Sequence, residues 1–114
     1  MKQPGKIVLF RFPQANLSGG KVRPALLLAR LPGVHDDWLT CMISSQRKHY
    51  HRGFDEIVEQ SDSDFVPSGL KLSSVIRIGR LAVVEGNVLL GAVGEISDER
   101  LKRIKTRLAQ WLNP

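Results

Sequence analysis

Polar and cationic side chains suited to a phosphodiester occur at several points of the chain. They are three arginines and two serines, namely Arg23, Ser44, Ser45, Arg77 and Arg80. RNA can be cleaved without a metal ion, because its 2′-hydroxyl already lies beside the scissile phosphate. A protein then supplies a proton acceptor, a proton donor and cationic hydrogen-bond donors for the phosphoryl transition state. Arginine suits the last role, since its planar guanidinium presents a fork of donors.

Histidines could supply the proton transfers, because a neutral imidazole can act as base or acid near pH 7. The chain has three, His35, His49 and His51, and the last two lie in a basic loop over residues 47–52. Exposed loop histidines usually do no catalysis, and a tyrosine between them could stack on a base. We therefore favour RNA contact over catalysis for this loop, through Arg47, Lys48 and Tyr50.

Metal and cofactor chemistry have no matching sequence pattern. The histidines show no H-x-x-x-H spacing and have no carboxylate cluster beside them. A Walker loop, a nucleophile elbow and a dinucleotide fingerprint are also missing. The single Cys41 can form no intrachain disulfide, and its apolar surroundings favour a buried, inert thiol. We expect no cofactor and no metal.

The charge balance favours an anionic partner. Seventeen Lys and Arg against eleven Asp and Glu give a formal net charge of +6. A polyanion is the obvious partner, although many small basic proteins are merely soluble, so charge alone leaves nucleic-acid binding open. The N-terminal apolar run is short and interrupted by Arg11, which predicts neither a signal peptide nor a membrane span. We expect a cytoplasmic protein with no membrane partner.

The elements that must position these side chains are mostly strands. A length of 114 residues suits one domain, over residues 1–114. β-branched and apolar runs separated by glycine and proline predict strands at 7–12, 23–29, 38–45, 54–58, 74–78, 81–84 and 88–93. Short strands at this spacing predict a mainly β fold, a strongly curved antiparallel barrel of five to seven strands.

The C-terminal segment has a different period. Ser97 is a good N-cap, and apolar residues then recur at helical spacing, which predicts a helix over residues 97–112. One face should pack on the barrel, and we expect a solvated basic face with Arg100, Lys102, Arg103, Lys105 and Arg107. The predicted core comprises Val8, Phe10, Leu26, Leu28, Ile43, Val75, Val83, Leu101, Ile104 and Leu108.

Several segments together resemble the MazF/PemK toxin family. Residues 19–28 look like the family's glycine-rich loop, Arg-Pro pair and aliphatic strand. Residues 42–46 resemble the strand end where members carry a Thr or Ser that holds the scissile phosphate, and residues 68–77 are similar to a later Gly-Leu and Ser-Val-Ile-Arg segment. Residues 4–8 and 93–97 match in order, so the similarity spans nearly the whole chain.

The resemblance implies an SH3-like small β-barrel that forms a homodimer. It implies a toxin of a type II toxin-antitoxin system, an endoribonuclease that cuts single-stranded RNA, such as mRNA, at short motifs without metal. A cognate antitoxin protein would silence it, and operator DNA would be bound only through the antitoxin complex. Arg23 would be the central acid/base or phosphate-stabilising group, Ser44 would orient the phosphate, and Arg77 falls where some members use a second catalytic arginine. Together with the basic loop, the predicted RNA-binding set is Lys21, Ser45, Gln46, Arg47, Lys48, Tyr50 and Arg80.

The chain departs from the family pattern at two positions. Gly79 stands two residues after Arg77, where some members place an acidic residue, and Val22 precedes Arg23, where others are acidic. The general base is therefore not identified. A non-catalytic nucleic-acid-binding barrel of the same family, acting as a transcription or growth modulator, is an alternative, and a protein-interaction module is a third. Structural alternatives are a strand-edge cation for Arg23 and a hydroxyl bonded within the sheet for Ser44.

Overall fold

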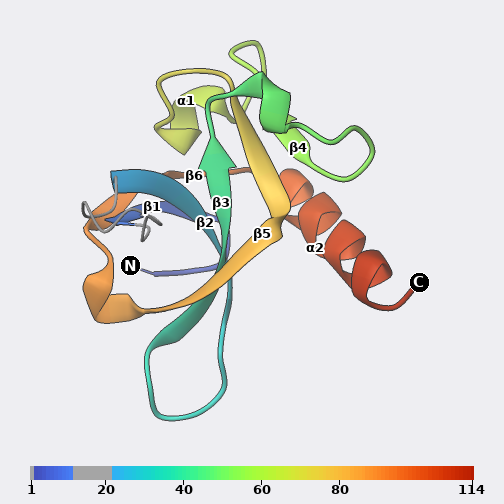
Figure 1. Cartoon of the computed structure of the whole chain (residues 1–114). Helices are drawn as coiled ribbons and strands as arrows, with labels where there is room; N and C mark the ends of the chain where they lie inside the picture. Colours follow the sequence, from blue (N-terminus) through green and yellow to red (C-terminus); the bar gives the residue numbers. More distant parts are fainter. Residues whose placement is uncertain (1, 12–21) are drawn as a thin grey trace.

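The computed structural model describes residues 2–11 and 22–114 (Figure 1). In chain order the strands are β1 (Lys6–Arg11), β2 (Val22–Arg30), β3 (Asp37–Ser44), β4 (Glu56–Val58), β5 (Ser74–Glu85) and β6 (Gly91–Glu95). The α-helices are α1 (Phe65–Ser68) and α2 (Asp98–Leu112), and the short 3₁₀ turns are η1 (Arg47–His49) and η2 (Gly86–Val88). The N-terminal glycine loop and Lys21 lie outside the described residues.

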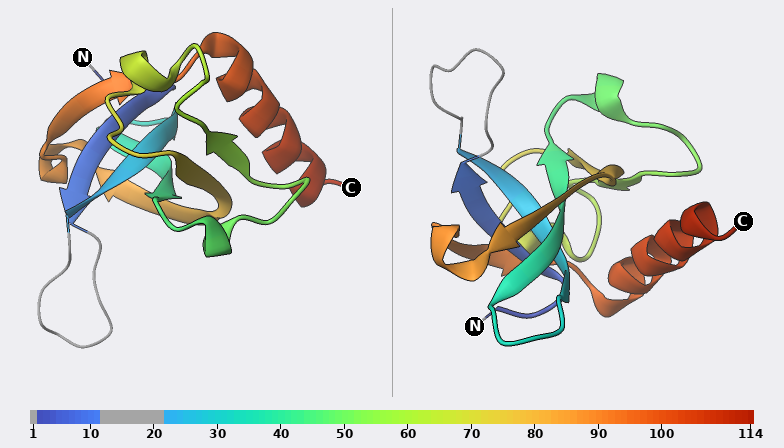
Figure 2. Two further views of the ribbon diagram at one scale, coloured as in Figure 1. Left: turned by 90° about the horizontal axis from the view of Figure 1, so that it is seen from above. Right: turned by 60° about the horizontal axis from the view of Figure 1, so that its bottom comes forward.

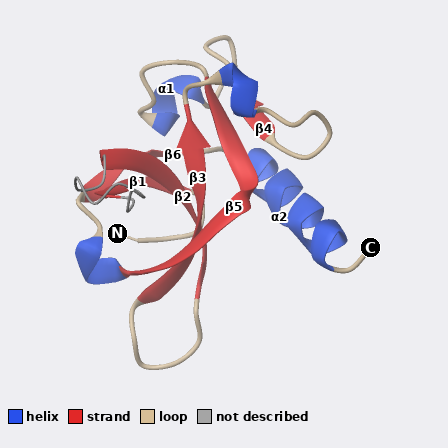
Figure 3. Cartoon of the chain, in the orientation of Figure 1, coloured by secondary structure: helices blue, strands red, loops and turns tan. Residues whose placement is uncertain are grey.

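The strands form one antiparallel sheet, in the order β4-β5-β3-β2-β1-β6 (Figure 3). The sheet curls into a half-barrel, and α2 lies beside it on the side of β4 (Figure 2). The predicted mainly β fold with a C-terminal helix is confirmed, and six strands fall within the predicted range. No helix in the described part of the chain is long and apolar enough to cross a membrane.

Strand β5 is longer than the sequence predicts. The runs at 74–78 and 81–84 belong to one strand of 12 residues. Its pairing with β3 shifts, because Arg77 pairs with Met42 while Leu81 pairs with the adjacent Cys41. Such an irregularity bends the strand and increases its twist. Gly79 lies in the shifted stretch, where an added Cβ would come within 3.1 Å of the Phe54 ring.

Helix α1 packs tightly against β6. An added Cβ on Gly69, whose φ is 72°, would lie 2.1 Å from the carbonyl oxygen of Val93. One on Gly94 would lie 2.2 Å from the carbonyl oxygen of Pro67. Glycine at both positions therefore lets the two backbones approach, and this contact joins the α1 segment to the edge strand of the sheet.

The apolar core forms two clusters. The larger contains Ile7, Leu26, Leu28, Cys41, Ile43, Val58, Ile76, Ile78, Ile96 and Ile104. The smaller contains Val8, Phe10, Ala25, Leu27 and Trp38. Burial raises the pKa of the Cys41 thiol to about 12, which fits the expected inert thiol.

The predicted core is correct at most positions. Leu101 and Leu108 are partly buried against the larger cluster. The prediction is wrong for Val83, because this residue is 56% exposed. Beyond the shifted pairing of β5, its neighbour Val84 instead packs against the smaller cluster.

Helix α2 begins as predicted, since the Ser97 hydroxyl accepts a hydrogen bond from the backbone N–H of Arg100 at 3.1 Å. The predicted solvated basic face is wrong for Arg100, which is only 6% exposed, and for Arg107, which is half-buried and pairs with Glu56. The Arg100 guanidinium contacts Asp64 at 2.7 Å, Asp62 at 2.9 Å and Glu56 at 3.0 Å. Arg100 is buried because these carboxylates, all from the segment that contains β4 and precedes α1, compensate its charge.

Removing the Arg100 guanidinium should be strongly destabilising. Arg100→Met would leave the buried Asp64 without its cationic partner, whereas Glu56 would keep its ion pairs with Arg103 and Arg107. Breaking a buried ion pair from one side costs about 3–5 kcal/mol, and we expect that loss in the free energy of unfolding measured by urea titration. Lys102→Met, on an exposed position of the same helix, is the control and should change it by less than about 0.5 kcal/mol.

The same network predicts a pH dependence of stability. Hydrogen bonds from Arg100 hold the pKa of Asp64 below its ordinary value. A carboxyl with a lowered folded-state pKa contributes stability above its unfolded pKa of about 3.9, and that contribution is lost as pH falls through the folded-state value. Asp64→Asn should therefore be less stable than the parent at pH 7, with a difference that shrinks below about pH 4. Thermal melts from pH 2 to 8 measure this, and a constant difference would contradict it.

Candidate functional site

A serine and a histidine meet at the end of β3. The Ser44 Oγ lies 2.7 Å from His49 Nδ1 and accepts a hydrogen bond from the backbone N–H of Gln46 at 3.1 Å. The 3₁₀ turn η1 follows directly beyond the arrowhead of β3 (Figure 1), and the backbone N–H of His49 donates to the Gln46 carbonyl. This turn folds the imidazole back onto the strand end. Ser44 is buried and His49 is half-buried.

Two arginines from neighbouring strands share the face of the sheet that carries Ser44. Met42 pairs with Ala25 of β2 and with Arg77 of β5. Directly opposed residues of antiparallel strands point to the same face, and so do residues two apart along one strand. Arg23, Ser44 and Arg77 therefore lie on one face, and both arginines are half-buried.

The surroundings of His49 disfavour its charged form. Partial burial lowers the pKa of the imidazole, and the positive charges of Arg77, Lys48, Arg23 and Arg80 lower it further. The ordinary value is about 6.5, so His49 is neutral at pH 7. A neutral imidazole among cations can exchange a proton while the cations hold an anion.

The other predicted contact residues surround this site. Ser45, Gln46, Arg47, Lys48 and Tyr50 follow the end of β3 and are exposed, as is Arg80 in the bend of β5. Arg47 is engaged in an ion pair with Glu59. Lys21 lies outside the described residues. The described members of the predicted set thus lie near the end of β3, with Arg23 and Arg77 supplied by the strands on either side.

The structure separates the histidines that the sequence groups together. The side chain of His49 contacts Ser44, whereas His51 is exposed and its backbone N–H donates to Asp55 at 2.8 Å. His35 lies in the connection between β2 and β3 and is exposed. No spacing in the sequence distinguishes these histidines, because the contact with Ser44 depends on how η1 turns.

Asp55 is a positioning residue that sequence reasoning missed. Its buried carboxylate accepts hydrogen bonds from the backbone N–H groups of His51, at 2.8 Å, and Ile78, at 3.1 Å. It thereby ties the loop that carries His49 to β5 immediately after Arg77. An acidic residue just before a short strand gives no sequence signal for this role.

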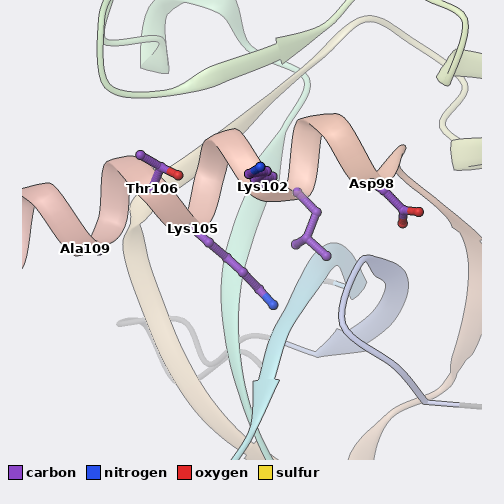
Figure 4. A pocket seen from close by; sticks show the side chains of 6 residues that line it. Asp98, Lys102, Lys105, Thr106 and Ala109 are labelled. Carbon is purple, nitrogen blue, oxygen red and sulfur yellow. The ribbon is translucent and has the colours of Figure 1, made fainter.

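Of the hollows in the described surface, one lies beside the candidate site and another along α2. The first, of 480 Å³, is lined by two cations and two serines, Arg23, Lys71, Ser45 and Ser74, together with Gly69 and apolar side chains, which are Leu9, Val22, Pro24, Ile43, Leu70, Leu72 and Val93. It adjoins the candidate site and combines two cations with apolar walls. The other lies along α2, where Figure 4 shows the side chains of Asp98, Lys102 and Lys105. It includes none of the predicted site residues.

The fold and the site together define a class of protein. It is a small basic half-barrel that presents hydroxyl, imidazole and guanidinium groups on one face. These groups can transfer a proton and bind an oxyanion, which are the functions that an attack on phosphorus requires.

The comparisons with known proteins identify the family. The sequence model of one protein family, the PemK-like, MazF-like toxins of type II toxin-antitoxin systems, matches residues 3–112. The chain belongs to this family. No curated protein matches it in sequence.

Solved structures share the fold. MazF (Form-I) from Deinococcus radiodurans is 23% identical, with a TM-score of 0.72 over 99% of this chain and 97% of the other. A MazE-MazF structure (Form-II) from the same organism is also 23% identical, with a TM-score of 0.73 and coverages of 97% and 95%. An endoribonuclease in complex with its cognate antitoxin from Mycobacterial species is 14% identical, with a TM-score of 0.70 and coverages of 100% and 98%. The resemblance seen in the sequence is thus confirmed.

Proposed function

We propose that this toxin-family protein is an endoribonuclease that cleaves single-stranded RNA, including mRNA, at short sequence motifs without a metal. The observation that carries the proposal is the convergence of Arg23, Ser44 and Arg77 on one face of the sheet, beside a neutral imidazole. These side chains come from three adjacent strands, so the sheet holds them in fixed relation to one another.

In this proposal Arg23 and Arg77 are catalytic residues that donate hydrogen bonds to the phosphoryl oxygens as negative charge develops on them. Two half-buried guanidiniums on either side of Ser44 suit a phosphate between them. Their electrostatic attraction for a phosphate is stronger there than in bulk water, because partial burial lowers the local dielectric constant.

Ser44 has a donor available for the phosphate. A hydroxyl has one O–H to donate and two lone pairs to accept. If Ser44 accepts from the Gln46 N–H and from the Nδ1–H of His49, its own O–H is left to orient a phosphate oxygen. Ser44 is the last residue of β3, so we infer that the phosphate rests at the end of this strand.

RNA beyond the scissile phosphate would lie along the exposed residues after β3. We propose contacts with Ser45, Gln46, Arg47, Lys48, Tyr50 and Arg80, and with Lys21, which lies outside the described residues. Arg47 would exchange its pairing with Glu59 for a phosphate. The hollow beside Arg23 has apolar walls against which an unstacked base can pack.

We further propose a cognate antitoxin protein as a partner, a homodimer as the active assembly, and the cytoplasm as the compartment. Family membership supports the antitoxin, and one of the structural relatives was solved with its cognate antitoxin. Operator DNA would be bound only through the antitoxin complex. A non-catalytic nucleic-acid-binding role is distinguished by its products, because only cleavage by the 2′-hydroxyl leaves a cyclic phosphate and a free 5′-hydroxyl.

Replacing Arg23 should remove most of the cleavage. We expect Arg23→Ala to cut a long defined RNA about 10²- to 10³-fold more slowly in EDTA, because one preorganised donor to the transition state is lost. Lys105→Ala, an exposed cation on α2, is the matched control and should cut at the parent rate. Circular dichroism checks that the fold is retained, and mapped ends report the products. Equal rates for parent and Arg23→Ala would refute the assignment.

The homodimer makes a separate prediction. Two copies would sum their positive charge around one RNA groove, since each chain carries a formal net charge of +6. Sedimentation equilibrium at micromolar protein should give twice the chain mass of 12.7 kDa. A single species at the chain mass would contradict it.

A further inference from the structure

We propose that His49 is the general base of the reaction, the group that accepts the proton of the attacking 2′-hydroxyl, with Ser44 as its positioning partner. The inference rests on the proposed function and supplies the base that the sequence does not identify. It starts from the 2.7 Å contact between Ser44 Oγ and His49 Nδ1.

The hydrogen-bond arrangement favours one tautomer for this role. The Gln46 N–H donates to Ser44 Oγ, which leaves that oxygen one further lone pair. When the Nδ1–H of His49 donates to it, the Nε2 of the same ring carries an unshared electron pair and can accept a proton. Ser44 thereby fixes the orientation of the ring, and its O–H stays available for the phosphate.

The charges around His49 keep this base unprotonated. Arg23 on β2 and Arg77 and Arg80 on β5 act on the imidazole, and Lys48 acts from the same turn. Together with partial burial they lower the pKa of His49, so the ring is neutral and ready to accept a proton at pH 7. The protonated ring is then stabilised by the negative charge that develops on the phosphoryl group.

The described carboxylates near this loop are engaged elsewhere. Asp55 is buried and accepts two backbone hydrogen bonds, and Glu59 pairs with Arg47. Gly79 offers no side chain two positions after Arg77. Among the described imidazole and carboxylate groups near Ser44, we therefore assign the proton acceptor to His49.

The proposed step balances as follows. The 2′-oxygen gives its proton to His49 Nε2 and forms a bond to phosphorus, while the bond between phosphorus and the 5′-oxygen breaks. The 5′-oxygen leaves with the electron pair of that bond and takes a proton from water. The products are a 2′,3′-cyclic phosphate and a free 5′-hydroxyl, and His49 later releases its proton to solvent.

The test is single-turnover cleavage of a single-site RNA in EDTA at saturating protein. His49→Ala should slow cutting about 10²- to 10⁴-fold, the usual range for losing a general base. Binding of the same RNA with a 2′-deoxy residue at the cleavage site should change by only a few-fold. His51→Ala, in the same loop but exposed, is the matched control and should cut at near the parent rate.

The pH profile separates a base from a structural residue. At subsaturating protein, where the rate reports the pKa of the free protein, the parent rate should rise with pH through a limb whose midpoint lies below about 6.5. This limb should vanish in His49→Ala. Lys48→Met removes one of the cations that act on the ring, so it should move the midpoint upward. Added imidazole should restore part of the rate in His49→Ala and none in Arg23→Ala.

Each outcome has a defined reading. If the parent cuts RNA but His49→Ala cuts equally fast, keeps the acidic limb, or loses binding by the same factor as cutting, His49 is not the base and the proposed function stands. If the parent leaves RNA intact, both proposals fall. Slow cutting, near-parent binding and a missing limb together support the base.

Discussion

The guanidinium of Arg100 is buried among the carboxylates of Glu56, Asp62 and Asp64, and the arrangement of the sheet edge depends on it. A buried cation needs all its partners, because desolvation is repaid only by complete pairing. The three carboxylates lie in the segment that runs from β4 toward α1, so Arg100 holds that segment against α2. Arg103 and Arg107 of the same helix add ion pairs to Glu56. Since Glu56 also pairs with Ile76 of β5, the constraint passes directly into the longest strand.

The position of the candidate site depends on this edge of the sheet. Asp55 precedes the fixed Glu56, and its carboxylate holds the backbone of His51 and of Ile78. The loop after β3 is therefore tied at both ends, by the strand at Ser44 and by Asp55. Within that span η1 turns the imidazole of His49 back onto Ser44. The site thus combines strand positions for the arginines and the serine with a loop residue whose freedom has been restricted.

The sequence predicts the parts of this arrangement that depend on local pattern. Alternating apolar residues and the N-cap at Ser97 lead to the strands and to α2. Gly79 indicates an interruption of the strand pattern, but no local feature tells whether the strand ends there or continues. The prediction therefore placed Val83 on the buried face of the sheet instead of the exposed one. Arg100 is four residues from the buried Ile104 and so shares its face of the helix. Its carboxylate partners lie at least 36 residues away in the chain, so its burial could not be inferred.

Side-chain chemistry and the family resemblance make Arg23, Ser44 and Arg77 candidates from the sequence, whereas neither distinguishes His49 from His51. The first three lie on strands, whose order and register follow from the fold, whereas the contact of His49 follows from one turn of 3₁₀ helix. The cations around that turn have two compatible effects. They make the surface at the end of β3 positive, and they lower the pKa of the His49 imidazole. In the proposed reaction, a basic surface therefore suits a neutral histidine as the proton acceptor. A chain with no carboxylate two residues after Arg77 can then still have a general base.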